Sequence, residues 1–370
     1  MSKLRLAIIG AGHLGRIHAR LAKSNEQLEV VGVVEPIAAA RTSVATELEL
    51  PTFEDFRSLL GKIDAAIVAT PTVHHYDVAS TLLRAGVHSL VEKPLASTPD
   101  QAERLVQIAH RHNLILQVGH VERFNPSWTA AQAHLGSPKY IECVRAGAYS
   151  GRSTDIGVVH DLMIHDIDLV LSLVRSPVAS ISACGLAVLG EREDLAEARV
   201  HFANGCIANF KASRISLEAT RRMSIYTTTS MAEIDFAKNE VRLVRPSAEV
   251  IERDVHLDRL TDQQRAVAKG TIFGDLFSVE TLPGQSRNAI LDEHNDFALS
   301  IRTNAAPMVS GEDGTKALQL AGLILDQIAA HRWEGEASRP WQIGPSASPH
   351  PHILPMHSAA ERKVPQRKVG

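Results

Sequence analysis

Residues 4–15, LRLAIIGAGHLG, decide the fold, because a continuous apolar run leads directly into three glycines at the spacing Gly10-x-Gly12-x-x-Gly15. A helical pattern follows, so the stretch predicts a strand, a tight turn and a helix. In such a unit the first glycine permits the turn, the second lets the backbone approach a pyrophosphate, and the third lets the helix pack on the strand. The helix N-terminus favours an anion. The turn, with His13 and Leu14 inside it, therefore predicts a dinucleotide site.

An acidic residue stands at the distance that such a site requires. Glu35 ends the second predicted strand, 28–34, twenty residues after Gly15. A carboxylate there binds the ribose hydroxyls and repels a 2′-phosphate, which favours NAD over NADP. Arg41 lies close enough in sequence to meet a phosphate, so NADP remains open as the less favoured cofactor.

Strands and helices alternate through the first third of the chain, which predicts an α/β Rossmann domain over residues 1–124. The further strands are predicted at 65–69, 87–91 and 114–118, and the helices at 14–23, 53–60, 75–85 and 99–112. These strands are mostly continuous apolar runs, as expected for a parallel sheet covered on both faces.

Two polar strand ends are predicted to line the ligand crevice, which in such sheets lies outside the carboxyl ends of the strands. The first is Thr70-Pro71-Thr72, with His75 opening the next helix, and the second is Glu92-Lys93-Pro94. We expect these residues to contact the cofactor. Burial of an unpaired ammonium costs free energy, so Lys93 also predicts an anionic or hydroxylic ligand at this place.

The pattern changes after Asn125 to alternating strands, which predicts a second, α+β domain over residues 125–335 with an open-faced, largely antiparallel sheet. Its strands are predicted at 140–146, 179–188, 198–202, 207–212, 222–228, 233–236 and 240–244, and its helices at 162–174, 288–303 and 314–332. The free face of such a sheet must meet solvent or another subunit. Residues 336–370, rich in Pro, Ser, His and basic residues, are predicted to form a mobile tail.

Composition excludes several classes of function. Thirty-nine Lys and Arg stand against 42 Asp and Glu, a net charge of -3, which disfavours nucleic-acid binding. The three cysteines show no metal-ligand spacing and suit a reducing compartment, so we expect a cytoplasmic protein without a metal. No uncharged run has the length of a membrane span.

A third motif, Gly157-x-x-x-Asp161-x-x-x-His165, supplies a candidate base. Residues four apart share a helix face. Oxidation of a secondary alcohol needs a base for the hydroxyl proton, and His165 is the best-placed titrating group, while Lys93 can stabilise alkoxide character. Asp168 is placed to orient the His165 imidazole. An ordinary capped, ion-paired helix start and a metal site remain the alternatives.

Taken in order, the glycine turn, Thr70-Pro71-Thr72, Glu92-Lys93-Pro94 and the third motif resemble the glucose–fructose oxidoreductase, inositol dehydrogenase and MocA-like family over about residues 4–333. The resemblance implies a sugar or polyol substrate on the open-faced sheet, which often also builds a homodimer or homotetramer. It further implies that Lys93 and His165 carry proton transfer, that Asp161 positions the substrate, and that the Lys93–Pro94 peptide is cis.

A narrower resemblance involves residues 119–126, GHVERFNP, and 160–169, HDLMIHDIDL, which are similar to the family branch containing UDP-N-acetylglucosamine 3-dehydrogenases. It implies an NAD-dependent oxidation of a sugar-nucleotide hydroxyl at C3, with Arg123 and Asn125 as substrate contacts. The arginines that can meet a diphosphate are Arg145, Arg152, Arg214, Arg221 and Arg222. A dehydrogenase of a free sugar or polyol such as inositol is one alternative. A catalytically idle NAD-binding sensor is another, although a sensor would need none of Lys93, Asp161 and His165.

Overall fold

The first half of the chain forms a parallel sheet in the order expected of a dinucleotide-binding fold. The computed structural model describes residues 2–331 except 150, 152–155, 283 and 285. The six strands are β1 (Leu4–Ile9), β2 (Leu28–Val34), β3 (Thr52–Phe53), β4 (Ala65–Val68), β5 (His88–Glu92) and β6 (Leu116–Gly119). They run parallel in the order β3-β2-β1-β4-β5-β6, so the strand order reverses between β1 and β4. The predicted Rossmann fold is confirmed, and this reversal places its crevice.

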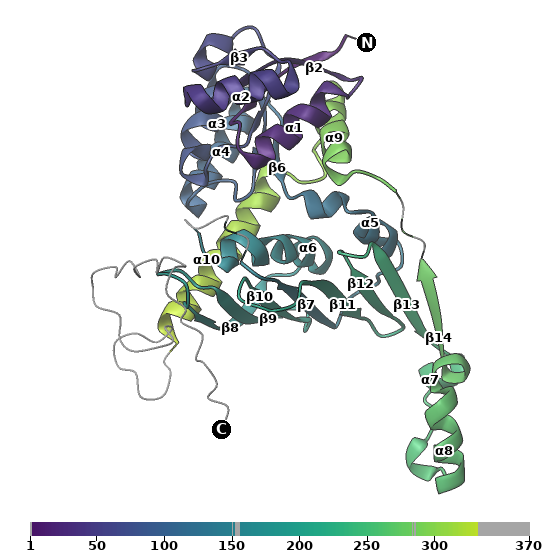
Figure 1. Cartoon of the computed structure of the whole chain (residues 1–370). Helices are drawn as coiled ribbons and strands as arrows, with labels where there is room; N and C mark the ends of the chain where they lie inside the picture. Colours follow the sequence, from purple (N-terminus) through teal and green to yellow (C-terminus); the bar gives the residue numbers. More distant parts are fainter. Residues whose placement is uncertain (1, 150, 152–155, 283, 285, 332–370) are drawn as a thin grey trace, which may run out of the picture.

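Helices cover this sheet on both faces (Figure 1). They are α1 (His13–Lys23), α2 (Ala38–Leu48), α3 (His75–Arg84) and α4 (Pro99–His112). The helix predicted at 53–60 is wrong, because these residues form the end of β3 and a short 3-10 turn, η1 (Phe56–Leu59), capped by Asp55. Sequence analysis missed α2, which buries only Val44 and Leu48 and so lacks an apolar stripe.

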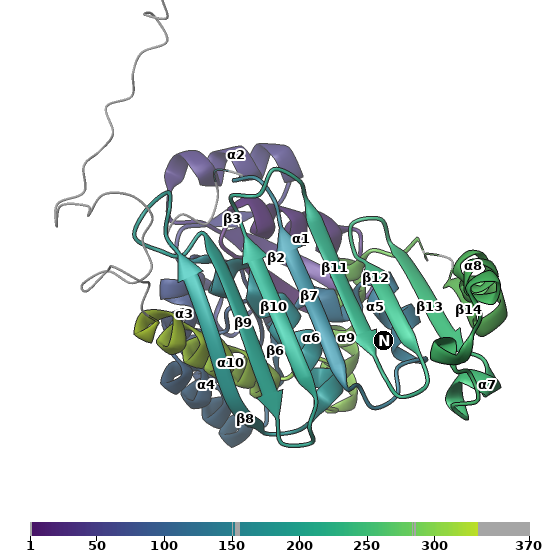
Figure 2. The same cartoon turned by 90° about the horizontal axis from the view of Figure 1, so that it is seen from below.

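The second half forms an eight-stranded sheet, largely antiparallel as predicted. Its strands are β7 (Tyr140–Ala146), β8 (Val178–Leu186), β9 (Leu195–Phe202), β10 (Ile207–Ser213), β11 (Thr220–Tyr226), β12 (Met231–Asp235), β13 (Glu240–Pro246) and β14 (Phe277–Leu282). The strand order is β14-β13-β12-β11-β7-β10-β9-β8. In this sheet β7 and β10 are parallel, and the other neighbouring pairs are antiparallel. The helices α5 (Pro126–Gln132), α6 (Ile164–Val174) and α10 (Gly311–Ala330) cover one face. The other face is open, as Figure 2 shows.

Two late helices return to the first sheet. Helix α9 (Ala289–Thr303) lies beside α1, and its Phe297 and Ala298 belong to the core that contains Leu6 and Ile8 of β1. Helix α10 runs from β6 and α4 down to α6 and β8, so it bridges both layers (Figure 1). The predicted division after residue 124 separates the two sheets, whereas the segment 125–335 contributes to both cores. The predicted tail, 336–370, lies outside the described residues.

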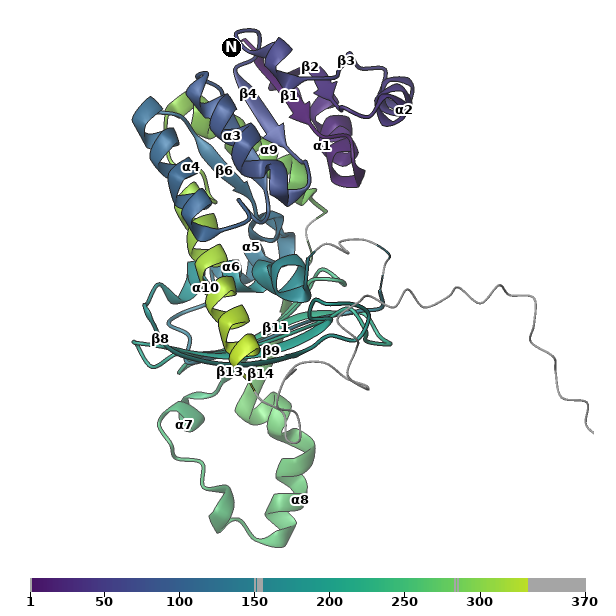
Figure 3. The ribbon, with the colours of Figure 1, turned by 90° about the vertical axis from the view of Figure 1, so that its left-hand side faces the viewer.

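A helical arm projects from the edge of the second sheet, on the side of its open face (Figures 1 and 3). The arm comprises α7 (Ala248–Ile251), η5 (Leu257–Arg259), α8 (Asp262–Thr271) and η6 (Ile272–Leu276), and it leads into β14. Neither α7 nor α8 buries a residue. None of the helices in the described part of the chain combines the length and apolar character needed to cross a bilayer.

Candidate active site

The glycine turn between β1 and α1 is shaped for a close ligand. Gly10 has a φ of +106°, and a Cβ there would stand 2.5 Å from the Ala69 carbonyl oxygen at the end of β4. A Cβ on Gly15 would overlap the Gly10 carbonyl, so each glycine is required by backbone packing. A Cβ on Gly12 would meet nothing within 4 Å, which leaves that side of the turn open. Helix α1 begins at His13 and Leu14 without a side-chain cap from any described residue, so its first N–H groups suit an anion.

Glu35 lies at the mouth of this turn. Its Oε2 accepts from the Ala11 N–H at 3.0 Å, and its Oε1 accepts from the Ile37 N–H at 3.0 Å. Arg41 is turned to other acceptors, since its guanidinium donates to the carbonyls of Glu35 at 2.6 Å and Pro36 at 3.0 Å. A carboxylate in place and an engaged arginine are the arrangement that suits NAD better than NADP.

Lys93, Asp161 and His165 come together although they lie in different halves of the chain. Lys93 follows β5, and its Nζ donates to the Asp161 carbonyl at 2.7 Å and to Asp161 Oδ1 at 3.1 Å. Asp161 lies in a wide helical turn, η4 (Val159–Met163), directly before α6. Gly157 permits this entry, because a Cβ there would overlap the Glu193 carboxylate, which accepts from the Val159 N–H. The Lys93–Pro94 peptide is cis, as the resemblance implies.

His165 stands in the first turn of α6 in a neutral state. Burial, and then the positive charges of Lys93 and Arg145, hold its pKa well below the usual range. The ring is half-buried, and its enclosed Nδ1 has no hydrogen-bond partner among the described residues. A neutral imidazole has an unprotonated ring nitrogen that can accept a proton.

His120 is a site residue that sequence analysis missed. It follows β6 directly, is fully buried, and meets His165 edge-on with 6.4 Å between ring centroids. Neither of its ring nitrogens contacts a hydrogen-bonding group within the described ranges, and buried Thr70 Oγ1 is likewise unpaired. Its place at the carboxyl end of a parallel strand was the available signal. These unpaired polar atoms point to a ligand or water at this place.

His75 and Glu92 have positioning roles instead of facing the crevice. His75 is 1% exposed, and its Nδ1 and Nε2 lie 2.8 Å from the carbonyls of Pro94 and Thr70, so it joins the two strand-end loops. Glu92 is buried and accepts from the Lys93 N–H at 3.2 Å. Thr70, Pro71 and Thr72 themselves remain at the crevice, at the end of β4. Internal groups take up the polar atoms of His75 and Glu92, and contact of these residues with the cofactor stays a prediction.

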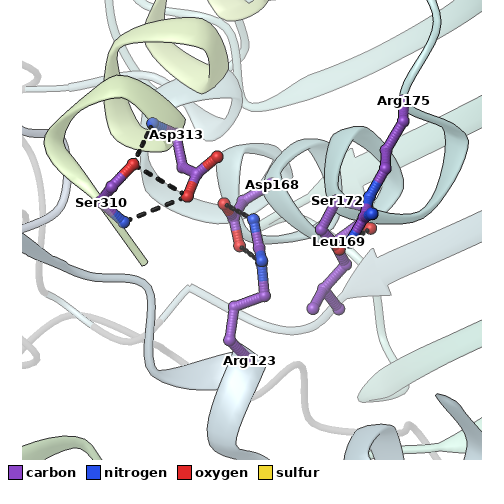
Figure 4. Close-up of polar contacts among 7 residues, drawn as sticks. All are labelled: Arg123, Asp168, Leu169, Ser172, Arg175, Ser310 and Asp313. Atoms are coloured by element: carbon purple, nitrogen blue, oxygen red, sulfur yellow. Dashed lines mark hydrogen bonds and ion pairs between the residues drawn. The ribbon is translucent and has the colours of Figure 1, made fainter. Parts of the chain in front are cut away.

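Arg123 and Asn125 are also engaged internally. Arg123 makes a two-point ion pair with Asp168, at 2.6 and 2.9 Å, as Figure 4 shows. Asn125 caps α5 by accepting from the Ser127 N–H and donates to Glu122. Contact of Arg123 and Asn125 with the substrate stays a prediction. Asp168 pairs with Arg123 and makes no hydrogen bond to His165 in the described structure.

The arginines predicted to meet a diphosphate differ in their partners and in the side of the second sheet that they face. Arg145 is buried against Asp166 and Glu122, Arg214 pairs with Asp194, and Arg222 pairs with Asp235 on the open face. Arg152 lies outside the described residues. Arg221 is exposed and lies directly opposite Arg145 in the β11–β7 ladder, so it faces the helix side near His165.

A dinucleotide turn that shares its crevice with a lysine, an aspartate and a neutral histidine defines a nicotinamide-dependent oxidoreductase acting on a CH–OH group. The model of an oxidoreductase family with an NAD-binding Rossmann fold matches residues 4–120, and the model of the Gfo/Idh/MocA C-terminal domain matches residues 129–233. The chain belongs to this Gfo/Idh/MocA family.

Similar proteins include sugar-nucleotide and polyol dehydrogenases. The chain is 37% identical to UDP-N-acetylglucosamine 3-dehydrogenase of Acidithiobacillus ferrooxidans over 67% of its own length and 79% of that protein. A solved structure of that enzyme superimposes with a TM-score of 0.78 and 32% identity, over 89% of this chain and 99% of the other. Inositol 2-dehydrogenase of Rhizobium meliloti is 22% identical over 89% of this chain and 98% of that protein.

Proposed function

We propose that this NAD-dependent oxidoreductase oxidises a secondary hydroxyl of a sugar nucleotide, namely the 3-hydroxyl of UDP-N-acetylglucosamine or a close relative. The observation that carries the proposal is the Lys93–Asp161 contact beside neutral His165, at the edge of the sheet where β1, β4, β5 and β6 end. The similarity to the Acidithiobacillus ferrooxidans enzyme supports this choice of substrate.

The cofactor is proposed to lie along the glycine turn, with its pyrophosphate at Gly12, His13 and Leu14 and its ribose hydroxyls at Glu35. Its nicotinamide, which takes the hydride from the substrate carbon, would then reach Thr70–Thr72 and Lys93. The cofactor-binding residues in this proposal are Gly10, Gly12, His13, Leu14, Gly15, Glu35, Thr70, Pro71, Thr72 and Lys93.

His165 would accept the hydroxyl proton while the carbon that bears this hydroxyl gives up a hydride, so that the alcohol becomes a ketone. Bound NAD would supply the hydride acceptor. The Lys93 ammonium donates to the substrate oxygen and stabilises the negative charge that develops there. Asp161 holds that ammonium through two acceptors and so aims it. A sensor that performs no chemistry would need none of these groups.

We infer that Arg221 contacts the diphosphate of the substrate. It is exposed on the reaction side of the sheet, and in the described structure it makes no ion pair. Its charge also contributes to the lowered pKa of His165. A free sugar or inositol has no anionic group for it, which separates the two candidate substrate classes.

The test is reduction of NAD by a panel of UDP-N-acetylglucosamine, UDP-glucose, UDP-N-acetylglucosaminuronate and inositol, with a carbonyl trap. Arg221→Gln should raise KM for the sugar nucleotide about tenfold, as expected for one charged hydrogen bond. Arg222→Gln, on the open face, is the matched control and should leave KM unchanged. Reduction by inositol alone would move the proposal to a polyol dehydrogenase.

We further infer a homodimer or homotetramer through the open sheet face, with the arm reaching around the second copy. The arm stands on that side and exposes Ile251, Val267 and Phe273 by 51%, 62% and 67%. Light scattering at micromolar concentration should give an assembled mass that Val267→Asp/Phe273→Asp reduces. A monomeric wild type would contradict the inference.

A reducing, cytoplasmic location completes the proposal. Cys143, Cys184 and Cys206 are all free thiols. An oxidising compartment would favour disulfides in their place.

A further inference from the structure

A buried cluster of ionisable side chains, outside the reaction crevice, joins three elements that are remote in sequence. His18 comes from α1, Glu92 from the end of β5, and Glu293 with His294 from α9. The first three offer ligand or hydrogen-bonding atoms that all lie within 4.8 Å of one another. His18, Glu293 and His294 are each 0% exposed, and Glu92 is 6% exposed.

Two short contacts link the histidines of this cluster to Glu92. The His18 Nε2–H donates to Glu92 Oε1 at 2.8 Å, since a carboxylate oxygen accepts. His18 Nδ1 and His294 Nε2 are also 2.8 Å apart, so one of these two nitrogens donates to the other. Burial, with the neighbouring His18, lowers the pKa of His294 to about 3, so His294 is neutral.

The carboxylate of Glu293 takes no part in these hydrogen bonds. No hydrogen-bond donor in the described structure reaches either of its carboxylate oxygens. A second negative charge beside Glu92 in a buried position is costly unless a cation or a proton compensates it. Burial, and then the charge of Glu92, raise the pKa of Glu293 well above its usual range.

We propose that Glu293 and Glu92 bind one proton between them at neutral pH, with Glu293 the acid that donates to the Glu92 carboxylate. Glu92 then accepts from Glu293, from His18, and through Oε2 from the Lys93 N–H at 3.2 Å. Glu293 is thus a positioning residue for Lys93. This last role rests on the proposed function, whereas the shared proton does not.

A divalent cation fits the distances less well than a proton. Two ligands of a tetrahedral cation about 2.1 Å away would be about 3.4 Å apart. His18 Nε2 and Glu92 Oε1 are 2.8 Å apart, which is a hydrogen-bond distance. The prediction that the protein holds no metal is tested below.

Other ionisable groups around the cluster fix its charge balance. Lys93 lies at the end of β5, His120 follows β6, His75 belongs to α3, and Asp296 lies one turn further along α9. His75 and His120 have pKa values lowered chiefly by burial, so they are neutral. Asp296 accepts from the Met308 N–H, and its negative charge helps to raise the pKa of Glu293. Lys93 is the cation adjacent in the chain, and its ammonium is already paired with Asp161.

The first test is infrared spectroscopy of the holoenzyme at pH 7.5, where a buried carboxylic acid gives a carbonyl-stretch band that ionised carboxylates lack. We expect the band in the wild type, its loss in Glu293→Gln, and its persistence in Glu249→Gln, a matched change on the exposed arm. Absence of the band from the wild type, or its persistence in Glu293→Gln, would overturn the proposal. If the purified protein contained one equivalent of a divalent metal that Glu293→Gln lost, the cluster would be a metal site and the proposal of a shared proton would be overturned.

The positioning role is tested by a pair of variants of similar size. Glu293→Gln still donates to Glu92 and should keep kcat, whereas Glu293→Leu does not and should lower kcat about tenfold or more. The Kd for NAD should change little in both. Equal kcat values for the two variants would remove the positioning role. If Lys93→Ala retains full turnover while the infrared band behaves as expected, the proposed function fails and the proton site stands.

Discussion

The Arg123–Asp168 pair gives a prediction that separates a structural role from a substrate role. The two hydrogen bonds are 2.6 and 2.9 Å long, and the side chains are 10% and 1% exposed. Asp168→Leu would leave a buried guanidinium without its counter-charge. Loss of one partner of a buried pair costs about 3–5 kcal/mol, so we expect the free energy of unfolding to fall by that amount.

The free energy of unfolding is measured by urea denaturation monitored with circular dichroism. The second variant is Arg123→Met/Asp168→Leu. Because apolar replacement of both partners removes the unpaired charge, the double variant should regain about 2 kcal/mol or more relative to Asp168→Leu. KM for the substrate should change little in the double variant. A loss below about 1 kcal/mol for Asp168→Leu, the range of exposed pairs, would refute the reasoning. So would a double variant of normal stability whose KM rises sharply, since Arg123 would then contact substrate.

Three further predictions follow from the same geometry. His165 must be neutral to accept a proton, and its pKa is lowered from the usual value. We therefore expect kcat/KM for oxidation to fall only on the acid side of about pH 6.5. If kcat/KM instead rose mainly above pH 7, the base would be Lys93. Six histidines in the described part of the chain have lowered pKa values, namely His75, His88, His120, His160, His165 and His294. The unfolded chain binds protons at these residues first, so Tm should drop as pH falls from about 7 to 5, and a flat Tm profile would contradict their burial. Gly15→Ala should abolish NAD binding measured by calorimetry, because its Cβ overlaps the Gly10 carbonyl, whereas Gly136→Ala, which meets nothing within 4 Å, should bind NAD normally.

The parts of the fold that sequence predicted are those with a local pattern. The glycine turn, β1 and β2 are fixed by neighbouring residues, and Glu35 follows at a constant spacing, so their places could be inferred directly. Helix α2 buries too little to show a period, and α7 and α8 of the arm bury no residue, so none of these helices showed an apolar stripe. The convergence of Lys93 with Asp161 and His165 came from family resemblance, and the structure supplies the contact that explains it.

The internal partners of the site residues could not be predicted, because these residues pair over long sequence separations. Arg123 and Asn125 were expected at the substrate because they follow a Rossmann strand. Arg123, however, meets Asp168, 45 residues later, and no local pattern shows that pair. His18 and His294 are 276 residues apart, so their contact could not be read from the sequence either.

These long-range contacts make the position of Lys93 dependent on both halves of the chain. The two acceptors that Lys93 Nζ contacts in the described structure both belong to Asp161, which the second half supplies. Its backbone N–H is held by Glu92, whose own surroundings include α1 from the start of the chain and α9 from near its end. Docking of the second sheet against the first therefore gives the ammonium its counter-charge and its direction in the same step. Any motion that opened the crevice at α6 would separate Lys93 from Asp161, so the aligned lysine exists only in the closed arrangement of the two sheets.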